Sequence, residues 1–188
     1  MTNIHLINTW KVAFGNAIPL GYLLRRQFHE RWLRIHSLPE SKRYPGSETE
    51  YAEMLHRHNT VATDLLGEGS PCLLIVMNAG DTPEWSNDED TALLGATPEH
   101  MWEVEDVLEG EDRMQFFALE VTWRHSAFDP LLRAVADWKT IGLFANLASQ
   151  SIYAPYDGGA DLIFAMHAHV APAKSKYTEW LSARKDGM

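Results

Sequence analysis

Residues 34–46 (RIHSLPESKRYPG) form the first of two segments with the side chains that chemistry needs. Arg34, His36, Ser41, Lys42 and Arg43 fall within one short stretch, and its two prolines restrict the backbone. These cations and the hydroxyl lie close in sequence to Ser47, where a helix is expected to begin. Together with the free N–H groups of that helix start, they could hold an anion. A structural role is equally open, because the helix macrodipole favours cations near a helix C-terminus and proline ends a helix.

The second segment is residues 153–161 (YAPYDGGAD), in which Tyr156, Asp157 and Asp161 surround a Gly-Gly turn. Two carboxylates and nearby backbone oxygens could bind a cation. Calcium loops need more oxygen ligands at closer spacing, and an aspartate in a turn commonly bonds its own backbone. We therefore expect a turn without a metal. The two segments could form one site for an anionic molecule if they were adjacent in space.

The charges of the chain are unevenly distributed. Residues 59–112 contain 14 acidic residues and no Lys or Arg, in a chain of 188 residues with net charge −10. Such a segment could steer a basic partner to the surface, or it could be a solvated insertion that keeps the protein in solution. Trp85 lies within it beside Asp88, Glu89 and Asp90, and an exposed aromatic residue there is a candidate interface anchor.

Several function classes are disfavoured by composition and motifs. The acidic charge argues against nucleic acid as the main partner. The single cysteine, Cys72, allows no internal disulfide or CxxC metal site, and it begins an apolar run in which a thiol would be inert. We find no nucleophile elbow, P-loop, dinucleotide fingerprint or HExxH motif, so we expect no catalytic residues, metal or cofactor. We expect a cytoplasmic protein without membrane association, because no apolar stretch could span a bilayer and the N-terminus does not resemble a signal peptide. Its oligomeric state stays open.

The elements that must position these residues follow from periodicity. Apolar residues at helical spacing predict helices over 17–36 and 48–66, with a shorter helix ending at Gly15 before them. Ser47 and Glu50 have the spacing of a capping box, and His58 lies on the apolar stripe as an expected hydrogen-bonded core residue. Further helices are expected over 97–110, from Asp129 with Trp138 facing inward, and over 173–185.

Strands are predicted over 72–79, 116–123, 141–147, 151–156 and 161–166. Pro155 makes the fourth of these an edge strand or an irregular one. Helices followed mainly by strands with short turns indicate a single α+β domain over 1–188, with a mixed or antiparallel sheet of about five strands and helices packed against it.

The segments RIHSLPESKRY and PYDGGADLI, with the helix between them and a WLS-like segment near the end, resemble a family of bacterial proteins of unknown function. The resemblance covers both ends of the chain and leaves the acidic middle unmatched. It implies a bacterial source and no particular activity.

The leading hypothesis is a non-enzymatic protein that binds a basic partner through its acidic surface, as an immunity protein or inhibitor would. The alternative is an enzyme or small-ligand protein for an anionic, phosphorylated molecule. In it Arg34, Lys42 and Arg43 hold the anion and His36 or His125 acts as general base. A third interpretation is a structural subunit whose Trp85 is covered by a second copy.

Overall fold

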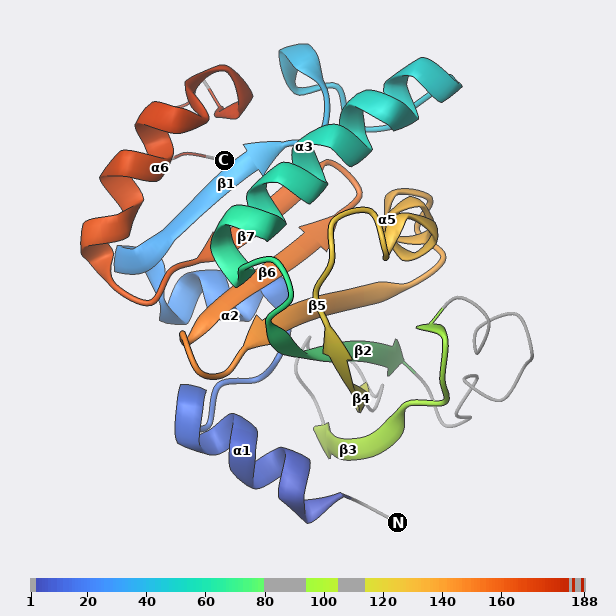
Figure 1. Ribbon diagram of the computed structural model, residues 1–188, viewed down its shortest axis with the longest axis vertical. Coiled ribbons are helices and arrows are strands. Elements are labelled where there is room, and N and C mark those ends of the chain that lie inside the picture. Colours follow the sequence, from blue (N-terminus) through green and yellow to red (C-terminus); the bar gives the residue numbers. More distant parts are fainter. Residues whose placement is uncertain (1–2, 80–93, 105–113, 183, 185–186, 188) are drawn as a thin grey trace.

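A computed structural model describes residues 3–79, 94–104, 114–182, 184 and 187 (Figure 1). Among these residues one antiparallel sheet of seven strands runs in the order β1-β7-β6-β5-β2-β4-β3. The α+β class and the antiparallel sheet are confirmed, with seven strands rather than about five. The strands are β1 (Trp32–His36), β2 (Pro71–Ala79), β3 (Glu99–Val104), β4 (Met114–Thr122), β5 (Ile141–Asn146), β6 (Ser151–Tyr156) and β7 (Gly159–Ile163).

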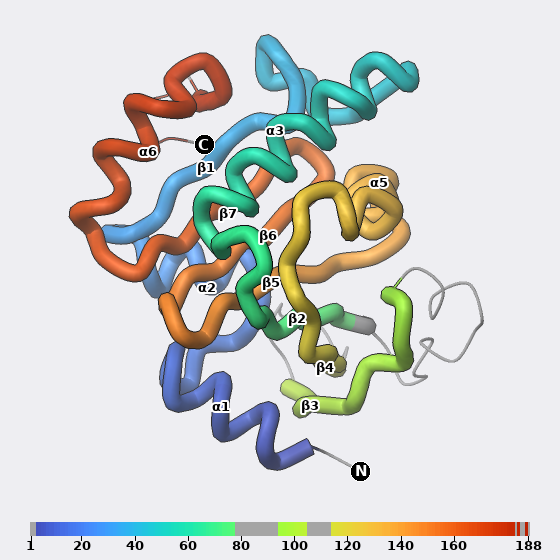
Figure 2. The backbone as a smooth tube through the Cα atoms, viewed as in Figure 1, coloured from blue at the N-terminus to red at the C-terminus, as the bar shows by residue number. Residues whose placement is uncertain are grey.

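Helices cover both faces of the sheet, and each face has its own apolar core. One face packs against α3 (Glu48–Leu66), α5 (Asp129–Ala136) and α6 (Val170–Lys176). The other packs against α1 (Ile4–Phe14) and α2 (Gly21–Gln27). Figures 1 and 2 show α3 crossing in front of β6 and β7 while α2 lies behind them.

Local signals in the sequence explain several of these elements. The Ser47 hydroxyl accepts a hydrogen bond from the Glu50 amide at the start of α3, and the helix ends at Gly67. The apolar run that begins at Cys72 is β2, which is buried on both faces between β4 and β5. The predictions for 48–66, 72–79 and 116–123 are therefore confirmed to within about two residues.

The prediction of one helix over 17–36 is wrong. The chain forms α2, then a short 3-10 turn (His29–Arg31), and then the strand β1. Leu33 and Ile35 are buried in the core on the face covered by α3, α5 and α6, while their neighbours face the opposite side, which is the alternation of a strand. The helical spacing up to Phe28 is real, but pairing with β7 overrides it afterwards.

The helix predicted over 97–110 is also wrong where the structure describes it, because residues 99–104 form the edge strand β3 paired with β4. The helix predicted over 173–185 begins earlier, as α6, and passes into a short 3-10 turn (Thr178–Trp180). Trp138 does not face the core, since it is 61% exposed. Each of these errors comes from a local pattern that contacts distant in sequence override.

The prediction of an edge strand at Pro155 is wrong, because β6 lies inside the sheet between β5 and β7. The strand is nevertheless irregular. Its pairing with β5 extends only from Ser151 to Tyr153, so Pro155 pairs with Ala160 of β7 and has no partner in β5. Beyond Tyr153 the strands β5 and β6 therefore diverge, and the missing N–H of the proline breaks no ladder bond to β5.

Candidate functional site

Strand pairing brings the two segments singled out in the sequence together. In the antiparallel register of β1 and β7, Arg34 lies opposite Asp161 and His36 lies opposite Gly159. A Cβ atom at Gly159 would stand 2.0 Å from the carbonyl oxygen of Ile35, so only glycine permits this approach. The segments 34–46 and 153–161 thus form one continuous region.

Arg34 and Asp161 form a buried bidentate ion pair. Arg34 donates from Nε at 2.9 Å and from Nη2 at 2.8 Å, and the Trp32 indole donates to the same carboxylate at 2.7 Å. The side chains are only 14% and 4% exposed. Burial lowers the pKa of Arg34, but its hydrogen bonds to Asp161 and the charge of that carboxylate outweigh burial, so the pKa is raised overall.

A second pair lies beside the first. Arg43 donates to Asp157 from Nε and, at 3.2 Å, from Nη2, and the Trp138 indole donates to the same carboxylate at 2.7 Å. The Asp157 side chain is 4% exposed whereas that of Arg43 is 56% exposed. Both aspartates of the second segment are therefore partners of the arginines of the first.

The anion clamp expected from the sequence is not assembled as predicted. The Lys42 ammonium pairs with Glu50, and Ser41 is exposed. His36 is half-buried, and burial, followed by the charges of Arg34 and Arg57, lowers its pKa. Of the predicted residues, Arg34, Arg43, Tyr156, Asp157 and Asp161 line a common cavity, and His36, Ser41 and Lys42 do not.

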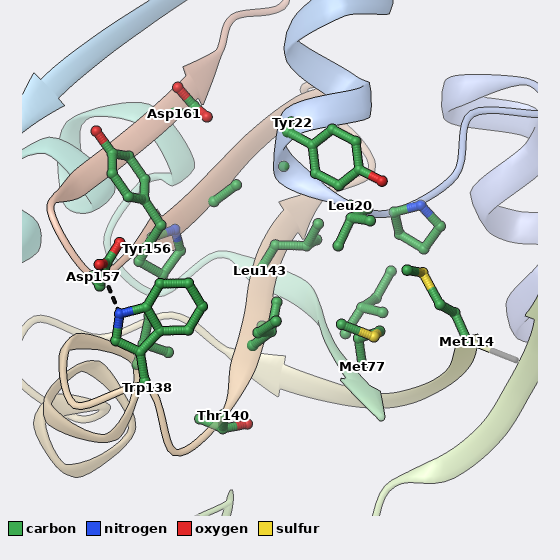
Figure 3. Close-up of a pocket in the computed structure, with 18 of the residues that line it drawn as sticks. Leu20, Tyr22, Met77, Met114, Trp138, Thr140, Leu143, Tyr156, Asp157 and Asp161 are labelled. Atoms are coloured by element: carbon green, nitrogen blue, oxygen red, sulfur yellow. Dashed lines mark hydrogen bonds between the residues drawn. The ribbon is translucent and has the colours of Figure 1, made fainter. Parts of the chain in front are cut away.

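This cavity has a volume of about 480 Å³ and lies on the α2 face of the sheet, where β5 and β6 diverge (Figure 3). Its wall is mostly apolar. The charged groups gather at the end formed by the two ion pairs, and Met77 and Met114 lie on the far side. The other apolar wall residues come from the start of α2 and from β2, α5, β5 and β6, and they include Leu20, Ile75, Val135, Leu143 and Ala154.

Two hydroxyl groups in the cavity wall lack a partner among the described residues. Tyr22 Oη and Thr140 Oγ1 are buried and form no hydrogen bond. A buried hydroxyl without a partner costs about 1–3 kcal/mol. A bound molecule with polar groups would recover this energy.

Trp138 stands at the cavity in an unusual backbone conformation. It follows α5 at the position of a left-handed helix cap, with φ of 61°, where glycine is the usual residue. For a bulky residue this conformation costs on the order of 1 kcal/mol or more. The strain is retained at an exposed indole held by Asp157, which is typical of a functional position.

Aromatic rings and guanidinium groups alternate at the polar end. The Arg34 guanidinium lies 4.5 Å from the Tyr156 ring centroid, and that of Arg43 lies 5.9 Å from the Trp138 ring. Burial raises the pKa of Tyr156 to about 12, so its hydroxyl is protonated at neutral pH. The wall thus offers ring faces and N–H and O–H donors to a ligand.

Ser37, His58 and Tyr153 form a separate network on the α3 face of the sheet. His58 bonds the Ser37 hydroxyl through Nε2 at 2.8 Å and the Tyr153 hydroxyl through Nδ1 at 2.6 Å. None of the three is more than 2% exposed, and burial lowers the pKa of His58 to about 3. The expected role of His58 as a hydrogen-bonded core residue is confirmed, and the pair with Ser37 is closed to a substrate.

Sequence reasoning missed several residues of the cavity, among them Tyr22, Met77, Met114, Trp138 and Thr140. The left-handed conformation of Trp138 is visible only in the structure, because many helices end without such a cap. The others come from separate elements, and no local spacing connects them.

Trp85, Asp88, Glu89 and Asp90 lie outside the described residues. In the part of the chain that is described, no group of three or more His, Cys, Asp or Glu could hold a metal ion. No helix there has the length and apolarity to cross a bilayer.

Residues 20–185 match the family model described as Domain of unknown function (DUF3885), and the chain belongs to this family. The match includes both segments that suggested a resemblance, and it also spans the acidic middle, which had been expected to lie outside. No curated protein and no solved structure matches the chain.

Proposed function

We propose that this DUF3885 domain binds a small molecule with an apolar body and a polar end. The observation that carries the proposal is the cavity of about 480 Å³ where β5 and β6 diverge. Ligand cavities commonly measure about 300–1,000 Å³ and combine apolar walls with a few convergent polar groups. This cavity has that size and that distribution of polarity.

Binding is favoured over catalysis by the side chains available. The carboxylates of Asp157 and Asp161 are both engaged by arginine, and the described wall residues include no histidine, cysteine or serine. A general base needs a free lone pair within reach of a substrate proton. Tyr22 and Thr140, with their free hydroxyls, are suited to orient a ligand.

Calorimetric titration with octanol and with octanoic acid tests this function. We expect at least one of them to bind the wild-type protein. Met77→Trp fills the cavity and should weaken binding by about tenfold or more, because the ligand loses its space. The same change at Met166, which is 57% exposed and outside the cavity, is the matched control and should leave affinity unchanged. No binding by either compound, or equal binding by both variants, would contradict the proposal.

A second candidate function is the binding of a basic protein through the acidic segment, in the manner of an immunity protein or inhibitor. It is favoured by the 14 acidic residues and the absence of Lys and Arg over residues 59–112. Both roles are proposed for a bacterial cytoplasm, which the resemblance and the single reduced cysteine suggest.

A pull-down from cell lysate at low and high salt would supply the partner for this second role. Reversing the charges of Asp88, Glu89 and Asp90 should then slow association with that partner and reduce the salt dependence of the rate. An association rate that does not change on charge reversal would contradict this role.

A further inference from the structure

The groups around the cavity carry more positive than negative charge. Arg34 and Arg43 line it and are each neutralised by one buried aspartate. Arg25 and Arg26 of α2 form no ion pair with any described residue. Near the polar end the guanidinium groups of Arg25, Arg34 and Arg43 therefore stand against two carboxylates, in a chain whose net charge is −10, whereas the exposed Arg26 lies over the Tyr22 ring. A local excess of positive charge attracts an anion.

Arg25 supplies the unbalanced charge closest to the polar end. It lies one helical turn beyond Gly21 and Tyr22, which line the cavity, so all three share one face of α2. Its guanidinium is 5.7 Å from the Trp32 ring, whose indole bonds Asp161. Partial burial, followed by the charge of Arg34, lowers the pKa of Arg25, although the nearby Asp161 carboxylate acts in the opposite direction.

Arg34 supplies donors inside the cavity. Asp161 occupies its Nε and Nη2 groups, and Nη1 has no hydrogen-bond partner among the described residues. The bidentate pair with Asp161 holds the guanidinium plane in place. A ligand oxygen could therefore accept from a donor whose position is already set, without the cost of ordering a free side chain.

On the basis of the proposed function, we infer that the ligand is an organic acid with a single carboxylate. The carboxylate lies at the Arg34 end, where Arg25 balances its charge, and the apolar body extends towards Leu143, Met77 and Met114. A phosphate dianion fits less well, because only the charge of Arg25 is unbalanced close to this end and two buried carboxylates are neighbours.

The test compares octanoic acid, octanol, octylamine and octyl phosphate by calorimetry with the wild-type protein. We expect octanoic acid to bind about tenfold or more tightly than octanol, because a hydrogen bond to a charged group is worth about 1.5–3 kcal/mol. Octylamine should bind more weakly than octanol, and octyl phosphate more weakly than the acid. Tighter binding of octyl phosphate than of octanoic acid would overturn the choice of a carboxylate.

Two neighbouring variants test the role of Arg25. Arg25→Gln should weaken octanoic acid by about fivefold or more and leave octanol unchanged. Arg26→Gln, at the next residue and more exposed, should change neither by more than about twofold. Octanol binding to both variants shows that the cavity has kept its shape.

The outcomes separate the two proposals. If neither octanol nor octanoic acid binds, the proposed function itself fails. If both bind with equal affinity, or if Arg25→Gln binds octanoic acid as tightly as wild type does, the cavity is a ligand site but the carboxylate is not recognised, and only this inference is overturned.

Discussion

Replacing Asp161 by asparagine tests whether the ion pair at the polar end holds this part of the fold together. The carboxylate accepts three hydrogen bonds, two from Arg34 and one from Trp32, and it is 4% exposed. Asparagine keeps the shape but removes the charge, and its amide nitrogen places a donor against a donor. Arg34, which is 14% exposed, is then left as an uncompensated buried cation.

The magnitude follows from this burial. Removing one partner of a buried ion pair typically costs about 3–5 kcal/mol. In a chain of this length about 1 kcal/mol shifts the melting temperature by roughly 2–4 °C, so Asp161→Asn should lower it by roughly 6–20 °C. Urea unfolding followed by circular dichroism would give the free energy directly.

The matched control is Glu48→Gln, which breaks the ion pair with Arg133. Glu48 is 82% exposed, so its removal should not measurably change the unfolding midpoint. Replacing both partners with apolar residues, as in Arg34→Met with Asp161→Leu, should recover most of the lost stability. A loss below about 1 kcal/mol for Asp161→Asn would refute the view that the pair is buried and specific.

Three further predictions concern other parts of the fold. The wild-type protein should lose stability as pH falls from 6.5, because the unfolded chain protonates His58 while the native pKa is about 3. His58→Gln should therefore reduce the difference in unfolding free energy between pH 6.5 and 4.5 by roughly 2–3 kcal/mol, and an unchanged difference would count against a neutral buried ring. Gly159→Ala should destabilise by about 3 kcal/mol or more because its Cβ meets the Ile35 carbonyl, whereas Gly46→Ala, facing the ends of the flexible Glu50 and Lys42 side chains, should cost less than about 1 kcal/mol in urea unfolding. Cys72, 5% exposed and with a pKa raised by burial to about 11, should not react with a thiol reagent at pH 8 until the protein unfolds, and rapid labelling of the native protein would contradict this.

Much of the framework was predictable because its signals are local. The cap at Ser47, the apolar stripe that includes His58 and the glycine at 67 define α3 without reference to the rest of the chain. The apolar run from Cys72 defines a buried strand, and the Asp157-Gly158-Gly159 turn joins two further strands. The same local reading identified Arg34, Arg43, Asp157 and Asp161 as residues of interest.

Tertiary structure decided which partners those residues have. Arg34 and Asp161 are separated by 127 positions in the chain, and only the pairing of β1 with β7 makes them partners. That pairing turned a predicted helix into a strand, because the pattern around Trp32 to His36 fits both periods and local propensity is weak beside a ladder of hydrogen bonds. The same pairing places Asp161 against Arg34, one of the cations that the sequence analysis had expected to bind an anion.

The cavity likewise depends on contacts that no local pattern records. Its walls come from α2, α5 and all the strands except β3. It opens because residues 141–143 of β5 pair with β2 but not with β6. The amino-acid sequence by itself determined the elements whose signals are local, such as α3 and β2, and the residues able to do chemistry. Which residues meet, and what space they leave between them, depends on strand register over more than one hundred residues, and only the folded chain decides it.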